Sequence, residues 1–122
     1  LFDYLYNSLI TIIKYLKINT KIIISSDLDI NNEMKGEDKV ISICKKLKAT
    51  TYINSLGGIN IYKSNRFKNE GINLKFLQPR NFVYDQKIKQ FYENLSILDT
   101  LMHVSKVEII KELNKFKLVN GT

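Results

Sequence analysis

The sequence contains one cysteine, one proline, one histidine and no tryptophan among its 122 residues. A single cysteine, Cys44, excludes an internal disulfide, and small secreted domains usually carry several cysteines, so we expect a cytoplasmic location. No uninterrupted apolar stretch approaches the roughly 20 residues that a bilayer-spanning helix needs, so we expect no membrane insertion. One histidine and one cysteine cannot build a structural zinc site, and we expect no metal.

The overall composition is that of a folded domain, with 44% hydrophobic and 25% charged residues. A chain of this length can bury a sizeable core. Neither a repeat nor a low-complexity linker interrupts it, so we expect residues 1–122 to form a single α/β domain. The chain opens on Leu1-Phe2-Asp3, inside an amphipathic pattern and without an initiator Met. We therefore expect it to be the C-terminal part of a longer protein.

The net charge of +7 raises the question of nucleic-acid binding. All but two of the basic residues are lysines, and they are scattered along the chain. Their tightest group, Lys45-Lys46 and Lys48, shares a helix with apolar neighbours and is typical of a solvated face. We therefore expect no nucleic-acid partner, and absent or salt-insensitive binding to a duplex would remove that alternative.

Hydrophobic periodicity predicts alternating helices and strands in the first half of the chain. The spacing of apolar residues indicates an amphipathic helix up to about residue 17 and a second helix after Gly36. The short β-branched run 21–25 and the segment 51–54 are typical of strands covered on both faces. The residues between the first strand and Gly36 are loop formers.

The second half begins with the same alternation and then loses it. We expect a third helical segment near residues 59–68, ended by Gly71, and a strand over 72–77. Pro79 breaks the rhythm, and residues 80–92 lack a clean period, so an extended loop is expected. Ser96 and Ser105 are suited to cap two further helices.

The order of these elements indicates parallel βαβ units. The predicted fold is therefore α/β and three-layered, with a short, mostly parallel sheet, flanking helices and extra C-terminal helices. It corresponds to part of a Rossmann-like fold.

The first candidate site is Ser25-Ser26-Asp27, at the carboxyl end of the predicted first strand. Ligands of open parallel sheets bind beyond the carboxyl ends of the strands. Two hydroxyls and a carboxylate there suit a sugar or ribose. An equally good interpretation is that Ser26 and Asp27 only cap the loop.

The second and preferred candidate is the strand-to-helix turn Asn54-Ser55-Leu56-Gly57-Gly58. Glycines let the backbone approach a ligand, and a helix N-terminus attracts anions. The spacing matches neither the P-loop nor the dinucleotide-binding fingerprint, so no cofactor is indicated. A tight turn capped by Asn54 or Ser55 explains the same letters.

Other candidates carry weaker signals. Tyr62 and Arg66 would share a helix face, where Arg66 could bind phosphate or carboxylate, or both could be surface residues. His103 lies among apolar residues, and we interpret it as structural rather than as a general base. Cys44 lies on an apolar stripe and is interpreted as an inert core thiol. Asp27 and Asp29 lack the spacing of a calcium loop.

The order and spacing of several short segments together resemble the WbqC-like family, which is encoded in bacterial O-antigen and other surface-polysaccharide loci. The resemblance runs over nearly the whole chain. It is carried by residues 24–28, 36–44 and 49–54 with Gly57-Gly58, then by Tyr62, Phe67, residues 71–76, Tyr84-Asp85-Gln86 and residues 95–101. Asp38, Lys39, Tyr84, Gln86, Ser96 and Asp99 also match family positions.

Two departures from the family pattern are evident. Family members usually begin with a Gln-Pro-rich strand and turn followed by an Asp-containing strand, which this chain lacks. They also tend to have Gly where this chain has Lys48. If the missing residues belong to the site, this chain holds only part of it.

The resemblance implies a role in surface-polysaccharide biosynthesis. It suggests an enzyme that transfers an amino-acyl group, such as glycine, to a sugar or nucleotide sugar. Its ligand would contact Ser25, Ser26, Asp27, Asn54, Ser55, Gly57, Gly58 and Tyr62. The residues offer no nucleophile-and-base pair, which favours the alternative of a non-catalytic nucleotide- or sugar-binding module in a biosynthetic complex.

Overall fold

A computed structural model describes residues 1–31 and 33–121 of the protein. These residues form two compact units, each built from two segments of the chain. Unit 1 comprises residues 1–21 and 80–115, and unit 2 comprises residues 22–79 and the segment that begins at Phe116. The described residues contain five α-helices and one three-stranded mixed sheet, so the α/β class is confirmed.

The sheet of unit 2 has the strand order β1 (Thr51–Ser55), β2 (Asn73–Pro79) and β3 (Phe116–Asn120). β1 pairs with β2 in parallel, with Tyr52 opposite Leu74, and β2 pairs with β3 antiparallel, with Phe76 opposite Val119. The sheet is therefore mixed rather than mostly parallel. Helix α3 (Ser64–Asn69) lies in the crossover between the parallel strands, which cannot be joined by a tight hairpin.

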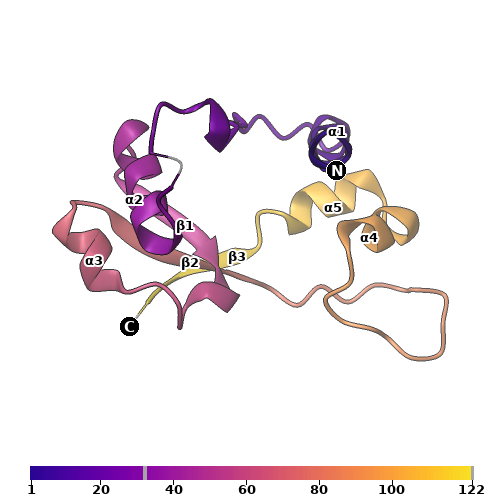
Figure 1. The fold of residues 1–122 in the computed structure, drawn as a ribbon. Helices are drawn as coiled ribbons and strands as arrows, with labels where there is room; N and C mark the ends of the chain where they lie inside the picture. Colours follow the sequence, from indigo (N-terminus) through magenta and orange to yellow (C-terminus); the bar gives the residue numbers. More distant parts are fainter. Residues whose placement is uncertain (32, 122) are drawn as a thin grey trace. The chain divides into compact units, whose positions relative to one another are not determined.

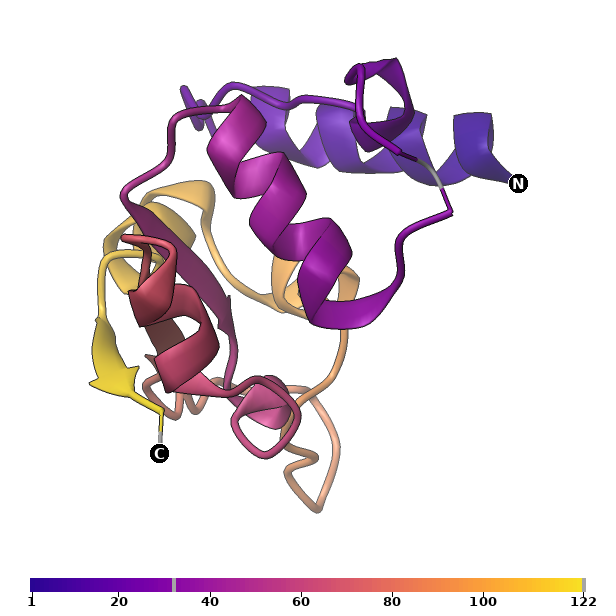
Figure 2. The same cartoon turned by 60° about the vertical axis from the view of Figure 1, so that its left-hand side comes forward.

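The core of unit 2 lies between the sheet and its two helices (Figures 1 and 2). Ile41 and Cys44 of α2 (Gly36–Lys46) and Phe67 of α3 pack with Leu74 and Phe76 of β2. Phe67 and Phe76 have no exposed surface, and each contributes about 1.5–3 kcal/mol through burial. Alternate strand residues point to opposite faces of a sheet. Ile53 and Leu118 lie on one face of the sheet and remain 46% and 44% exposed. Helices α2 and α3 therefore cover the opposite face.

Two sequence predictions for unit 2 are wrong. Residues 21–24 form no strand, and Ser25–Asp27 is a single 3-10 turn. A β-branched run becomes a strand only where a neighbour accepts its backbone hydrogen bonds, and no described strand pairs with it. Strand β3, which begins at Phe116 shortly after α5 ends, was not predicted from the sequence.

The predicted third helix begins later than expected. A 3-10 turn at Leu56–Gly58 follows β1, and α3 begins only at Ser64. The predicted stop is confirmed, since Gly71 has a positive φ of 73°, a conformation that glycine adopts without a Cβ penalty. The predicted helices at the start of the chain and after residue 35 are confirmed as α1 and α2.

Unit 1 contains α1 (Phe2–Tyr15), α4 (Ile97–His103) and α5 (Lys106–Glu112), with an irregular segment before α4. Both predicted caps are confirmed: Ser96 accepts a hydrogen bond from the Leu98 N–H, and Ser105 accepts one from the Glu108 N–H. Leu16, Gln86 and Ile109 are its buried residues. Across the described part of the chain, every helix is too short or too polar to traverse a lipid bilayer.

Candidate functional site

The preferred turn in unit 2 places two of the predicted side chains, Asn54 and Tyr62, against the predicted Gly58. β1 ends at Ser55, and the 3-10 turn follows immediately. A Cβ atom added to the buried Gly58 would lie 2.5 Å from Asn54 Nδ2 and 3.3 Å from Tyr62 Cδ2. The Asn54 amide and the Tyr62 ring therefore both lie against Gly58, in space that a side chain at this position would occupy.

The rest of this turn is more open. Asn54 Oδ1 accepts a hydrogen bond of 2.8 Å from the Ser55 N–H, which fixes the orientation of the amide group. No atom lies within 4 Å of the Cβ position of Gly57, so the backbone there can be approached from outside. Ser55 and Gly57 are both exposed. The turn thus presents one oriented amide beside accessible backbone.

An aromatic cluster supports the turn from the core side. The Tyr62 ring lies 6.1 Å from Tyr52 and 6.0 Å from Phe67, while Tyr52 stacks on Phe67 at 5.6 Å. Burial raises the pKa of Tyr52, and the neighbouring Tyr62 adds to this effect. Burial also raises the pKa of the Cys44 thiol, which agrees with its interpretation as an inert core thiol.

The other predicted segment, Ser25-Ser26-Asp27, is not brought to this turn. All three residues are exposed, and they follow irregular backbone rather than a strand. Figures 1 and 2 show this purple segment well apart from the Leu56–Gly58 turn in both views. The prediction that Ser25-Ser26-Asp27 lies at the carboxyl end of a strand required a strand at residues 21–25, which the structure lacks.

Arg66 joins two helices and is not paired with Tyr62 on a helix face. Its Nη2 lies 2.5 Å from Asp38 Oδ1, and its Nη1 lies 3.6 Å from Glu37 Oε2. The Lys63 N–H, at the N-cap of α3, donates to Glu37 Oε1 at 2.5 Å. The guanidinium donors of Arg66 are therefore directed at the carboxylates of α2, and Asp38 has a structural partner.

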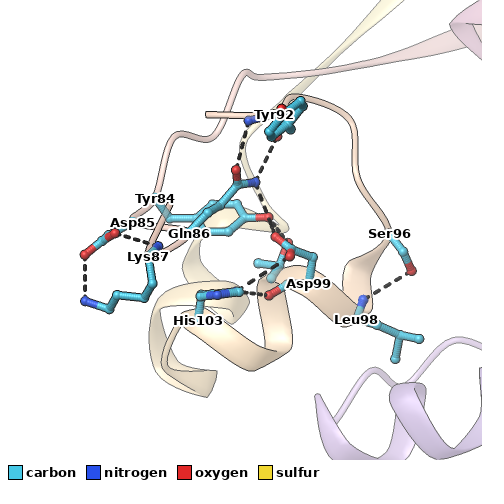
Figure 3. Close-up of polar contacts among 10 residues, drawn as sticks. Tyr84, Asp85, Gln86, Lys87, Tyr92, Ser96, Leu98, Asp99 and His103 are labelled. Carbon is cyan, nitrogen blue, oxygen red and sulfur yellow. Dashed lines mark hydrogen bonds and ion pairs between the residues drawn. The ribbon is translucent and has the colours of Figure 1, made fainter. Parts of the chain in front are cut away.

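Unit 1 contains a second polar cluster, which comprises Tyr84, Gln86, Asp99, Thr100 and His103 (Figure 3). The Tyr84 hydroxyl donates to Asp99 Oδ2 at 2.6 Å, and Gln86 Nε2 donates to the same oxygen at 3.3 Å. Thr100 Oγ1 donates to the Tyr84 hydroxyl at 3.2 Å. We call this set the Asp99 network.

Gln86 anchors the irregular segment to the Asp99 network. Its side-chain amide donates to the Tyr92 carbonyl at 2.8 Å and accepts from the Tyr92 N–H at 2.9 Å. Only 6% of Gln86 is exposed, and it is the one buried polar residue among those described. All the hydrogen-bonding groups of this amide therefore have partners, as a buried amide requires.

His103 lies at the other end of the Asp99 network. Its Nδ1 lies 2.8 Å from the Asp99 carbonyl oxygen and 3.7 Å from Asp99 Oδ1. Nearby, hydrogen bonds from Lys87 lower the pKa of Asp85, and the charge of His103 contributes a smaller lowering. Asp85 Oδ2 lies 2.6 Å from Lys87 Nζ, so the opposite charges of these two exposed side chains neutralise each other.

The Asp99 network was not predicted from the sequence. Tyr84, Gln86 and Asp99 match family positions, but the first turn of a predicted helix already accounts for an acidic residue at position 99. The signal that could have found the network is the pair of polar residues at 84 and 86, which point the same way if the segment is extended. Within the described ranges, no three residues of the His, Cys, Asp and Glu types gather to hold a metal.

Comparison with known proteins gives one match. No curated protein and no solved structure matches the chain. The model of the WbqC-like protein family matches residues 1–111 of the 122 residues. This match spans both units and includes the Asn54–Gly58 turn and the Asp99 network. The chain therefore belongs to the WbqC-like protein family.

Proposed function

We propose that the protein acts in bacterial surface-polysaccharide (O-antigen) biosynthesis in the cytoplasm, as a transferase of an amino-acyl group, such as glycine, to a sugar or nucleotide sugar. Family membership is consistent with an association with polysaccharide biosynthesis. The observation that carries the ligand-binding part is that the Asn54 amide and the Tyr62 ring both lie against Gly58.

This arrangement suits recognition of a sugar. The Asn54 amide combines a donor and an acceptor, the complement of a hydroxyl-rich ligand. An aromatic ring beside polar groups offers an apolar body with a hydrogen-bonding tip. The open space over Gly57 leaves room for a ligand beside the backbone. In this proposal Asn54, Ser55, Gly57, Gly58 and Tyr62 contact the ligand.

Ser25, Ser26 and Asp27 have a different place in the proposal. They are exposed and lie apart from the glycine turn, so they would contact a distal part of an extended ligand or only cap their loop. A larger three-layer, Rossmann-like sheet around the parallel β1–α3–β2 unit is likewise a proposal, supported by the parallel pairing of β1 with β2.

The alternative is a non-catalytic nucleotide- or sugar-binding module of a biosynthetic complex. It is favoured by the burial of Cys44, because the one thiol of the chain is then not accessible to act as a nucleophile. The two functions differ in turnover. A transferase consumes an activated glycine in the presence of an acceptor sugar, whereas a module binds the sugar and leaves the donor unchanged.

A thermal-shift experiment tests the ligand site. Uridine- and thymidine-diphosphate sugars should raise the Tm, since a ligand at 100 times its Kd stabilises by about 2.7 kcal/mol. Asn54→Ala should remove the shift, and Asn65→Ala, which truncates an exposed asparagine on α3, should leave it intact. The proposed site fails if no nucleotide sugar shifts the Tm or if Asn54→Ala shifts as the wild type does.

A further inference from the structure

Strand β1 has one free edge in the sheet of unit 2. β2 lies on one side of β1, and among the strands that the structure describes none lies on the other. Asn73 of β2 is opposite Thr51 but donates its backbone N–H to the Thr50 carbonyl at 2.9 Å. Thr50 therefore points toward β2, and the backbone groups of Thr51 and Ile53, which alternate with it, point to the free edge. Such an edge can accept a further strand.

Residues 21–25 have the features of a strand without a partner. Ile24 has the extended dihedral angles φ −85° and ψ 121°. Ile22 and Ile24 are partly buried while Ile23 is 41% exposed, and β1 shows the same alternation. Within the described part of the chain, neither Ile22 nor Ile23 makes a backbone hydrogen bond. A segment that served only as a linker would need neither the β-branched side chains nor this alternation.

The two helices of unit 2 indicate which edge of the sheet this segment would join. α2 precedes β1 and α3 precedes β2, and both helices cover the same face. They run in the same direction, because Glu37 contacts Lys63 near their first residues and Lys45 contacts Glu70 near their last. Crossovers between parallel strands are almost always right-handed, so two crossovers on one face advance across the sheet in one direction. A strand before α2 therefore belongs on the side of β1 away from β2.

We infer that residues 21–25 dock on the free edge of β1 as an additional parallel strand, and that the structure shows the undocked arrangement. In the docked register Ile23 lies opposite Ile53, and both side chains point to the face that the helices leave open. The Ile24 N–H donates to the Ile53 carbonyl, and the Ile53 N–H donates to the Ile22 carbonyl. The connection to β1 contains α2, as a crossover between parallel strands requires.

Docking would complete the proposed ligand site, and this consequence rests on the proposed function. Ser25 becomes the last residue of the added strand, opposite Ser55 at the end of β1. Ser25-Ser26-Asp27 then lies at the carboxyl edge of the sheet beside the Asn54–Gly58 turn, where ligands of parallel sheets bind. A sugar that contacts both segments binds only the docked arrangement and shifts the equilibrium toward it. The added strand therefore closes the site when the ligand binds.

Disulfide trapping tests docking without a ligand. In the docked register, Ile23→Cys with Ile53→Cys places two thiols on the same face of adjacent strands, at a Cα separation that a disulfide can span. The control, Ile22→Cys with Ile53→Cys, has nearly the same separation in sequence but side chains on opposite faces. In a glutathione redox buffer the first pair should close at least about tenfold faster than the control. The native Cys44 is buried and should stay reduced. Equal rates of closure overturn the inference.

Proline substitution tests the hydrogen bonds of the docked strand. Ile24→Pro removes the N–H that would donate to β1, whereas Ile23→Pro removes an N–H that points away from it, where an edge strand tolerates proline. Saturating UDP-N-acetylglucosamine should slow hydrogen exchange of the Ile53 amide by about threefold or more in wild type and in Ile23→Pro. Ile24→Pro should show no such slowing. Equal slowing in the two proline variants overturns the inference.

The two experiments distinguish failure of docking from failure of the proposed function. If nucleotide sugars neither raise the Tm of the wild type nor slow its exchange, the proposed ligand fails, and faster closure of the Ile23→Cys, Ile53→Cys pair still supports docking. If a nucleotide sugar raises the Tm but the two cysteine pairs close at equal rates, docking is overturned. The ligand contacts would then be confined to the Asn54–Gly58 turn and Tyr62.

Discussion

The side chain of Gln86 and the backbone of Tyr92 exchange two hydrogen bonds. These bonds hold the two ends of the irregular segment 86–92 together. Gln86→Leu would leave both groups of Tyr92 without this partner and would remove the bond to Asp99. We expect a loss of about 2–4 kcal/mol in the free energy of unfolding, measured by urea denaturation.

The matched control is Gln90→Leu, which makes the same change at an exposed position of the same segment. It should change the free energy of unfolding by less than about 0.5 kcal/mol. Limited proteolysis should also cut between residues 86 and 92 faster in Gln86→Leu. Equal stability of the two variants would contradict the assignment of Gln86 as the anchor.

Gly58 and Gly57 form a second matched pair. Gly58→Ala places a methyl group 2.5 Å from Asn54 Nδ2 and 3.2 Å from its Cγ, so the amide must move. We expect a cost of about 1–3 kcal/mol, whereas Gly57→Ala meets no atom within 4 Å and should be nearly neutral. Combining Gly58→Ala with Asn54→Ala should recover part of the loss, and additive losses would rule out the contact.

The partly buried Tyr52 should make the protein sensitive to alkali. Burial raises its pKa in the folded state above the ordinary 10.0, so the unfolded chain loses this proton first. The resulting stability is fully present below about pH 10 and is lost as the pH rises through the folded-state pKa. Each such proton steepens the decline by up to about 1.4 kcal/mol per pH unit.

Tyr52→Phe should therefore flatten the decline of stability above about pH 10, as followed by urea denaturation at each pH. Tyr4→Phe, which alters a tyrosine that is 75% exposed, provides the control. Burial also raises the pKa of Cys44 from 9.0. Cys44 therefore adds to the loss of stability with rising pH, beginning at a lower pH, in both Tyr52→Phe and Tyr4→Phe. The same slope in Tyr52→Phe and wild type would be evidence against this effect.

Glu37 and Asp38 should differ in their importance although both contact Arg66. Glu37 also accepts from the Lys63 backbone N–H, and its side chain is only 16% exposed. Glu37→Ala should cost about 1–2 kcal/mol, because it removes a charge-assisted hydrogen bond at the start of α3. Asp38→Ala, at 60% exposure, should cost less than about 1 kcal/mol. Thermal denaturation in low salt compares them, and the reverse order would refute this view of the α2–α3 link.

The sequence predicted the elements whose signals are local. The stripes of Ile41 and Cys44 and the caps Ser96 and Ser105 lie within single helices, and each was placed correctly. Strands were harder, because a strand exists only through its neighbour. Residues 21–25 have strong β propensity and no partner, while β3 is stabilised by a pairing that joins Lys75 to Asn120 across 45 residues.

For the candidate sites, too, the sequence indicates local contacts more readily than long-range ones. Asn54, Gly58 and Tyr62 are close in sequence, and the side chains of Asn54 and Tyr62 both lie against Gly58 in the structure. The Asp99 network joins Tyr84 and Gln86 to a helix more than ten residues away. No periodicity encodes such a contact. It depends on how the irregular segment folds back, which Gln86 and Tyr92 decide.

The interleaving of the two units bears on the order of events during synthesis. Residues 80–115 of unit 1 leave the ribosome after β2 and before β3. The edge of β2 that pairs with β3 therefore stays unpaired until β3 has been synthesised. An unpaired strand edge is a template for joining other chains, and it is most dangerous while a chain is incomplete. The pairing of β3 with β2 is therefore a late step in the folding of the nascent protein. Truncation before Phe116 should yield chains that associate with one another rather than a smaller soluble product.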